Sequence, residues 1–179
     1  MALRPILWHP DPVLKEKCEP VEVFDESIRA LVRDMAETMY AAPGVGLAAP
    51  QIGVTRRIFV IDVRDQDPSG GPKLRAFINP KIVEKKGEIV WEEGCLSIPG
   101  VNEDILRAER VRVAAMDETG APFELEAEGL LAVAIQHEND HLDGILMFDR
   151  LSPLRRKFSL RKYKRELAKR MEESKAAQG

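Results

Sequence analysis

The segment Gln136-His137-Glu138-Asn139-Asp140-His141 constrains the fold of this chain most, because its two histidines are four residues apart. An α-helix turns 100° per residue, so both histidines project from nearly the same face, about 6 Å apart along the axis. Both imidazoles can therefore reach one metal ion. Glu138 is offset by one residue, which puts its carboxylate beside the metal, where it could take a proton from water. The pattern predicts a metal-binding helix and favours hydrolysis.

A catalytic metal site normally takes three ligands from the protein, so a third ligand has to be found. The remaining histidine, His9, lies in a proline-rich stretch that indicates a surface turn. Cys18 lies among charged residues and is best interpreted as an ordinary unpaired thiol. Cys95 lies where a predicted strand ends and breaks into a turn around Pro99-Gly100. It is the better candidate for the third ligand.

The glycine-rich run from Gly44 to Gly53 lacks the Lys-Ser/Thr ending of a phosphate loop and the spacing of a dinucleotide fingerprint. Gly44 and Gly46 would instead allow the backbone to approach a substrate closely. The amide of Gln51 can donate a hydrogen bond to a developing oxyanion. A structural turn is the alternative interpretation.

Three motifs, in this order along the chain, resemble the signature motifs of the peptide deformylase family. They are Gly44-Val45-Gly46-Leu47-Ala48-Ala49-Pro50-Gln51-Ile52-Gly53, Glu93-Gly94-Cys95-Leu96-Ser97 and Gln136-His137-Glu138-Asn139-Asp140-His141-Leu142-Asp143-Gly144. The resemblance extends from Ile6 to Ser152 without a large insertion. Together the motifs are far more specific than one His-Glu-x-x-His pattern.

The resemblance implies a hydrolase that removes the formyl group from N-formylmethionine at the start of nascent peptides. It implies that Cys95, His137 and His141 hold one divalent metal ion and that Glu138 is the base. Gln51 and the Leu96 backbone N–H would stabilise the oxyanion, and Asp140 would pair with an arginine, for which Arg107 is the candidate. Residues expected to contact the substrate are Gly44, Val45, Gly46, Gly94, Leu130, Val133 and Ala134, although the spacing of the last three also suits core positions.

The expected donor set of one cysteine and two histidines fits zinc, and by its softness also ferrous iron, cobalt or nickel. The resemblance implies Fe(II) in the cell, with zinc, nickel or cobalt as replacements. Two alternatives remain open. A zinc endopeptidase shares the helix motif but usually takes its third ligand from a downstream His or Glu. A non-catalytic RNA-binding protein would need a structural site, usually closed by a fourth protein ligand.

With 179 residues, the chain is expected to bury roughly 70% of its unfolded surface as one domain, without disulfides. Its two cysteines form no disulfide framework, and no hydrophobic leader follows Met1. These features predict a reducing compartment, the cytoplasm. No apolar run is long enough for a membrane span. A monomer is expected.

The order of predicted elements indicates an α+β fold, with antiparallel or mixed strands around a central metal-binding helix, and with a C-terminal helix. Residues 1–152 are expected to form the catalytic metallohydrolase domain, and 153–179 a basic helix or tail of the same domain. We predict helices at 27–42 and 129–143, strands at 57–63, 76–84, 87–92, 110–117 and 123–127, and polar turns at 67–72 and 118–120.

The segment from Leu154 to Arg170 contains nine basic residues and one acidic residue, in a chain whose net charge is −3. A solvated helix face is one interpretation of such a run. The other is a surface for ribosomal RNA, because formylmethionine is found on nascent chains. Apolar residues that could form a docking stripe are Leu154, Phe158, Leu160, Leu167 and Met171.

Overall fold

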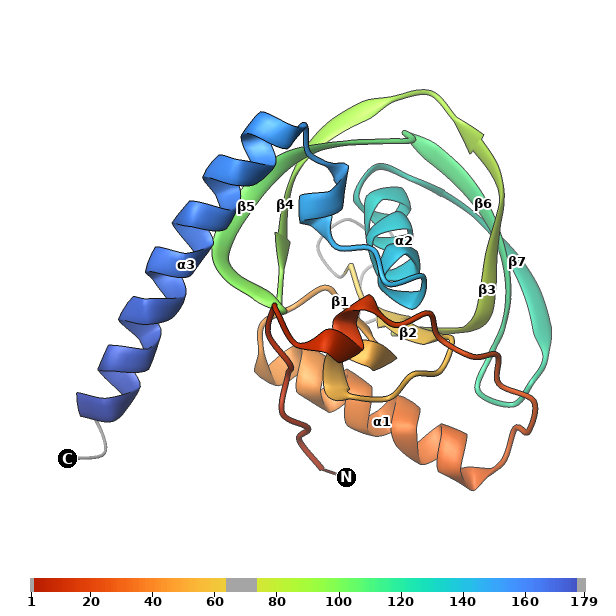
Figure 1. The fold of residues 1–179 in the computed structure, drawn as a ribbon. Helices are drawn as coiled ribbons and strands as arrows, with labels where there is room; N and C mark the ends of the chain where they lie inside the picture. The colour runs from red at the N-terminus through yellow and green to blue at the C-terminus, as the bar shows by residue number, and fades with distance from the viewer. Residues whose placement is uncertain (1, 64–73, 177–179) are drawn as a thin grey trace.

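The computed structural model describes residues 2–63 and 74–176 and has the predicted α+β architecture. Helix α2 (Gly129–Leu142) lies at the centre, with strands curving around it (Figure 1). The predicted turn at 67–72 lies outside the described residues. Within the described part of the chain, no helix has both the length and the apolar character to cross a membrane.

Two antiparallel sheets surround α2. The five-stranded sheet has the order β1-β2-β3-β6-β7, and β4 and β5 form a separate hairpin. Register shifts in the pairing of β3 with β6 are the irregularities that let long strands bend. The strands are β1 (Gly46–Ala48), β2 (Ile58–Ile61), β3 (Arg75–Lys86), β4 (Ile89–Cys95), β5 (Ile98–Arg107), β6 (Arg110–Met116) and β7 (Pro122–Glu128).

Five of these strands were predicted from the sequence, and β1 and β5 were not. Strand β1 has only three residues, and two of them, glycine and alanine, have low β propensity. Strand β5 begins with Ile98-Pro99-Gly100, whose proline and glycine resemble a turn. The reversal occurs instead at Leu96-Ser97, because Cys95 and Ile98 are already paired. Cys95 therefore lies at the end of a strand, as predicted, but the following turn has only two residues.

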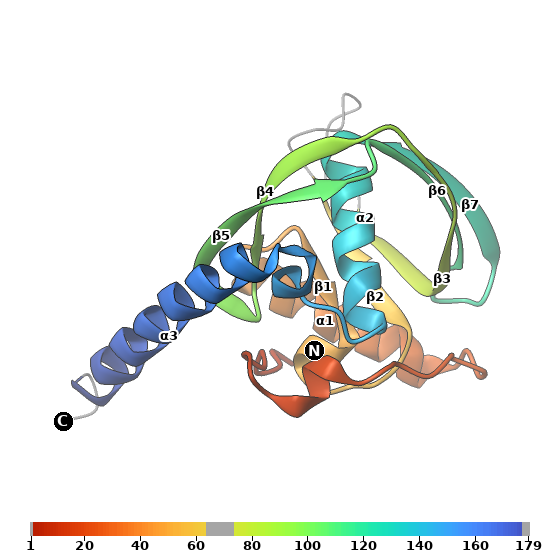
Figure 2. The same cartoon turned by 45° about the horizontal axis from the view of Figure 1, so that its top comes forward.

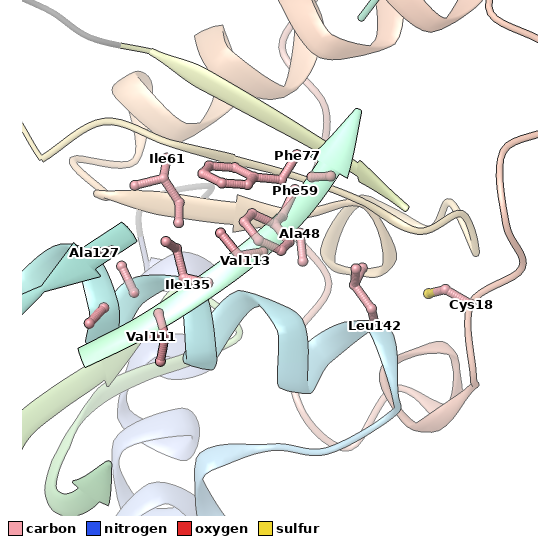
Figure 3. Packing of buried hydrophobic residues seen from close by; sticks show 13 residues of the cluster. Cys18, Ala48, Phe59, Ile61, Phe77, Val111, Val113, Ala127, Ile135 and Leu142 are labelled. Atoms are coloured by element: carbon pink, nitrogen blue, oxygen red, sulfur yellow. The ribbon is translucent and has the colours of Figure 1, made fainter. Parts of the chain in front are cut away.

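The core is formed where the five-stranded sheet packs on α2. Phe59 and Phe77 stack on neighbouring strands with ring centroids 4.8 Å apart. Figure 3 shows Ile135 of α2 pointing toward the strands that carry Ile61 and Val113. Each such side chain, when fully buried, contributes about 1.5–3 kcal/mol. This packing fixes α2, and with it the two histidines, against the sheet.

The helix ends follow from local sequence. Helix α1 (Glu26–Ala41) begins after Asp25, whose carboxylate accepts the Ser27 N–H. Helix α2 ends just before Gly144, which has a φ of 70°. Both helices confirm the predicted ranges to within one or two residues. Short 3-10 helices are η1 (Pro12–Lys15), η2 (Ala49–Ile52) and η4 (Met147–Arg150).

Helix α3 (Pro153–Ala176) packs on β5 along a narrow face and then runs away from the body of the molecule (Figure 2). Tyr163 is buried and Leu160 and Leu167 are half-buried, but Leu154 and Phe158 are more than half exposed. The predicted docking stripe was therefore wrong at Leu154, Phe158 and Met171. At 100° per residue, Leu154 lies on the side opposite Tyr163.

Candidate metal centre

Three side chains converge on one point between α2 and the end of β4. One ligand atom from each of Cys95, His137 and His141 lies within 4.8 Å of the other two. Cys95 Sγ is 3.4 Å from His141 Nε2. Among the described residues, this is the only such group of three or more that could hold a metal ion. His9 lies outside it.

A buried carboxylate fixes the orientation of His137. Its Nδ1 lies 2.8 Å from Glu93 Oε2, so Nε2 is the ring nitrogen left for a metal. Glu93 also accepts hydrogen bonds from Arg107 Nε and Nη2, at 2.7 and 3.0 Å. Burial opposes ionisation, but the hydrogen bonds from Arg107 and His137 lower the pKa of Glu93 to about 2. A carboxylate behind a histidine is typical of metal sites, where it sets the ring and its basicity.

Glu93 was missed in the sequence analysis, although it belongs to a quoted motif. The available signal was strand periodicity. Glu93 and Cys95 are two residues apart, a spacing that in a regular strand places both side chains on one face.

Asp140 is held by two arginines on the other side of this network. It accepts a hydrogen bond of 2.6 Å from Arg107 Nη1, the pairing suggested from the sequence. Arg150, which the sequence analysis did not identify, also contacts Asp140, at 2.5 and 2.9 Å. Burial works against the charge on Arg107, but Glu93 and Asp140 raise its pKa. The network ties α2 to both strands of the β4–β5 hairpin.

Glu138 lines the cavity next to the cluster and is buried. Burial raises the pKa of this carboxyl to about 7. Its Oε2 has no hydrogen-bond partner among the described protein atoms. A Cβ on Gly46 would lie 2.5 Å from Glu138 Oε1, so only glycine leaves room for the carboxylate here.

Gln51 lies across the cluster with its amide orientation fixed. Its Oε1 accepts the Ala48 N–H at 2.8 Å, so its Nε2 faces the β4–β5 turn. That nitrogen donates to Ser97 Oγ at 3.1 Å and lies 3.8 Å from Cys95 Sγ. Leu96, in the turn itself, also lines the cavity. The geometry therefore places Gln51 Nε2 beside Cys95, next to the turn that contains Leu96.

A cavity of about 420 Å³ opens onto this cluster and brings together every residue suggested for substrate contact. Val133 and Ala134 are buried and yet line the cavity, so they serve both core and pocket. Trp91, Pro43 and Pro99 also line it, and the sequence analysis did not identify them. The suggested contact residues in its wall are Gly44, Val45, Gly46, Gly94, Leu130, Val133 and Ala134.

The donor set fits a divalent transition metal. Two imidazoles and one thiolate suit zinc, and also ferrous iron, cobalt or nickel. Burial lowers the pKa of His141 well below its usual value, which favours the neutral ring that metal binding requires. For His137 burial acts in the same direction, but Cys95 and Glu93 raise its pKa. Cys18 is buried elsewhere, and burial raises its pKa to about 11.

Comparison with known proteins gives one consistent result. The profile of a family described as polypeptide deformylase matches residues 3–157. A peptide deformylase of Chromobacterium violaceum is 52% identical over 155 residues, covering 87% of this chain and 90% of the relative. The crystal structure of a peptide deformylase from Legionella pneumophila matches with a TM-score of 0.86 and 48% identity, over 96% of this chain and 98% of that chain. A structure from Ehrlichia chaffeensis, in complex with actinonin, matches with a TM-score of 0.85 and 42% identity, over 93% and 98%.

Proposed function

We propose that this chain, which belongs to the polypeptide deformylase family, removes the formyl group from the N-terminal formylmethionine of newly made polypeptides. The observation that carries the proposal is the convergence of three metal donors with a buried carboxylate, Glu138, in one cavity. Cys95, His137 and His141 would hold the metal. A bound divalent cation would polarise the formyl carbonyl and lower the pKa of water.

The cavity suits a methionine side chain. Val45, Leu130, Val133 and Ala134 supply apolar surface, and burial of such a side chain is worth about 1.5–3 kcal/mol. Gly44, Gly46 and Gly94 present only backbone in the cavity wall. A peptide main chain can therefore approach closely, which holds the formyl group at the cluster.

The remaining steps are carried out by the protein's own groups. Glu138 accepts a proton as water attacks the formyl carbon. Gln51 Nε2 and the Leu96 N–H donate hydrogen bonds to the oxyanion that forms on the formyl oxygen. Glu138 then passes its proton to the leaving amine nitrogen as the C–N bond breaks. The products are formate and a peptide with a free N-terminal methionine.

Formate release from a formyl-Met tripeptide tests this proposal. The purified protein should release formate and leave internal peptide bonds intact. Cleavage of an internal bond in an unformylated peptide would favour an endopeptidase instead. A protein that binds RNA but cleaves neither the formyl group nor a peptide bond would favour the non-catalytic alternative.

For the metal, we propose Fe(II) in the cell, with zinc, nickel or cobalt as replacements. The thiolate ligand Cys95 accommodates each of these ions. Metal analysis after purification without oxygen tests the choice. Iron in the anaerobic protein, with activity falling on exposure to air, is expected. Zinc in the anaerobic protein at full activity would contradict it.

We further propose that residues 1–152 form the catalytic metallohydrolase domain and that residues 153–179 form a basic helix or tail of the same domain. This helix would contact ribosomal RNA in the cytoplasm. The basic residues of α3 are exposed, and the helix projects from the body (Figure 2). Binding should weaken about tenfold per tenfold increase in salt for each phosphate neutralised. Reversing the charges of Lys157, Arg161 and Lys164 should abolish ribosome cosedimentation without slowing hydrolysis of a short peptide. Full-length protein that never cosediments at low salt would contradict this.

A further inference from the structure

The turn at Leu96-Ser97 is held from outside the cavity by the N-terminal segment. The backbone N–H of His9 donates to the carbonyl of Ser97, with an N–O distance of 2.9 Å. Ser97 is fully buried, and its hydroxyl accepts the hydrogen bond from Gln51. In Figure 1 the N-terminal segment passes the end of the β4–β5 hairpin where this turn lies. Any shift of His9 therefore acts on the turn.

The same segment also contacts Gln51, the other suggested oxyanion donor besides the Leu96 N–H. The Leu7 N–H donates to the Gln51 carbonyl at 2.8 Å. Residues 7 and 9 thus hold Gln51 and Ser97 by alternate backbone N–H groups, in the manner of an extended chain. The segment itself belongs to no helix or sheet. Its first residues are held by α1, where Ala2 and Arg4 donate hydrogen bonds to Asp34 and Thr38.

Helix α3 holds the segment at His9 through one side chain. The Tyr163 hydroxyl donates a hydrogen bond of 2.7 Å to the His9 carbonyl. Tyr163 is 1% exposed and His9 is half-buried, so this bond is partly buried. The rings of His9, Phe148 and Tyr163 pack together as a triangle. The His9 centroid lies 5.5 Å from that of Phe148 and 5.8 Å from that of Tyr163, and the latter two are 6.0 Å apart. Cys95 packs against the same cluster.

We propose that Tyr163 is a positioning residue for the hydrolysis: through His9 it holds the turn that carries the Leu96 N–H and follows the metal ligand Cys95. This inference rests on the proposed function. The His9 carbonyl accepts the bond from Tyr163 and the His9 N–H donates the bond to Ser97. Both groups belong to one residue, so holding the carbonyl also holds the N–H. An oxyanion donor stabilises the transition state best when its N–H already points at the position of the oxyanion. The position of the turn therefore affects kcat.

The variant Tyr163→Phe tests the proposal, because it removes the hydroxyl and keeps the ring in its cluster. At a temperature where both proteins are fully folded, kcat for a formyl-Met peptide should fall roughly threefold to tenfold, the equivalent of one hydrogen bond. KM and metal content should stay the same. Amide hydrogen exchange at His9 should accelerate, while exchange in the core of α2 should not.

Arg155→Gln is the matched control, because Arg155 also fastens α3 to β5, through Glu103 and the Asp104 carbonyl, but makes no contact with the N-terminal segment among its described partners. Its kcat should stay at the wild-type value. An unchanged kcat in Tyr163→Phe, or an equal loss in Arg155→Gln, would overturn the proposal. So would faster exchange throughout the protein. Failure of the proposed function is seen separately, as a wild-type protein that releases no formate.

Discussion

Replacing Gly46 with alanine should disable the proposed base while leaving the metal site intact. The added Cβ would lie 2.5 Å from Glu138 Oε1 and 2.9 Å from its Cδ. Ordinary contact distances are about 3.5–4.0 Å, so the carboxylate has to move by about 1 Å. A misplacement of 1 Å at a reacting group can cost about 100-fold in rate. We therefore expect kcat to fall by about two orders of magnitude, within the contribution of a general base.

The assay is formate release from a formyl-Met tripeptide, with metal analysis of the same preparation. The metal ligands do not include Gly46, so about one metal per chain should remain, as in the wild-type protein. Gly46 lies in an ordinary strand conformation that alanine can adopt, so the fold should persist.

Gly120→Ala is a matched control with the opposite outcome. Gly120 has a φ of 85° in the turn between β6 and β7, away from the cavity. Alanine there should lower the melting temperature and leave kcat unchanged, because left-handed backbone costs about 1–2 kcal/mol outside glycine. A Gly46→Ala protein with kcat within twofold of wild type would refute the argument about Glu138.

Four further outcomes are expected. Glu138→Gln should retain metal but lose turnover, whereas Cys95→Ala should lose both; normal turnover in Glu138→Gln would remove the base from the mechanism. Glu93→Gln should lower the free energy of unfolding by up to about 3–5 kcal/mol, since the buried Arg107 loses one charged partner. It should also weaken metal affinity by about 10–100-fold in a competition titration; unchanged affinity would argue against a role for Glu93 behind His137. Formyl-Met peptides should exceed formyl-Gly peptides in kcat/KM by about 10–150-fold, from side-chain burial, and acetyl-Met peptides should react more slowly because of the extra methyl group; equal values for all three would count against the pocket. In metal-free folded protein at pH 8, iodoacetamide should label Cys95 but not Cys18, whose pKa burial raises to about 11; peptide mapping that finds both labelled equally would contradict this.

Much of the candidate site could be read from the sequence because its key spacing is local. Within one helix, backbone geometry alone sets the relation of His137, Glu138 and His141. The same holds for the ends of α1 and α2, where Asp25 and Gly144 act on their immediate neighbours. Cys95 was found because few other candidates existed and because its motif resembled that of a known family.

What the sequence could not supply are contacts between distant segments. The Glu93–Arg107 pair joins residues 14 apart, and the Tyr163–His9 contact joins residues 154 apart. No periodicity within one element encodes such distances. The docking face of α3 was mispredicted for the same reason, since its apolar residues are spread around the helix and only packing on β5 selects the side with Tyr163. Local backbone geometry thus determined which side chains of α2 share a helix face. Tertiary packing alone decided which residues from other elements hold those side chains in place.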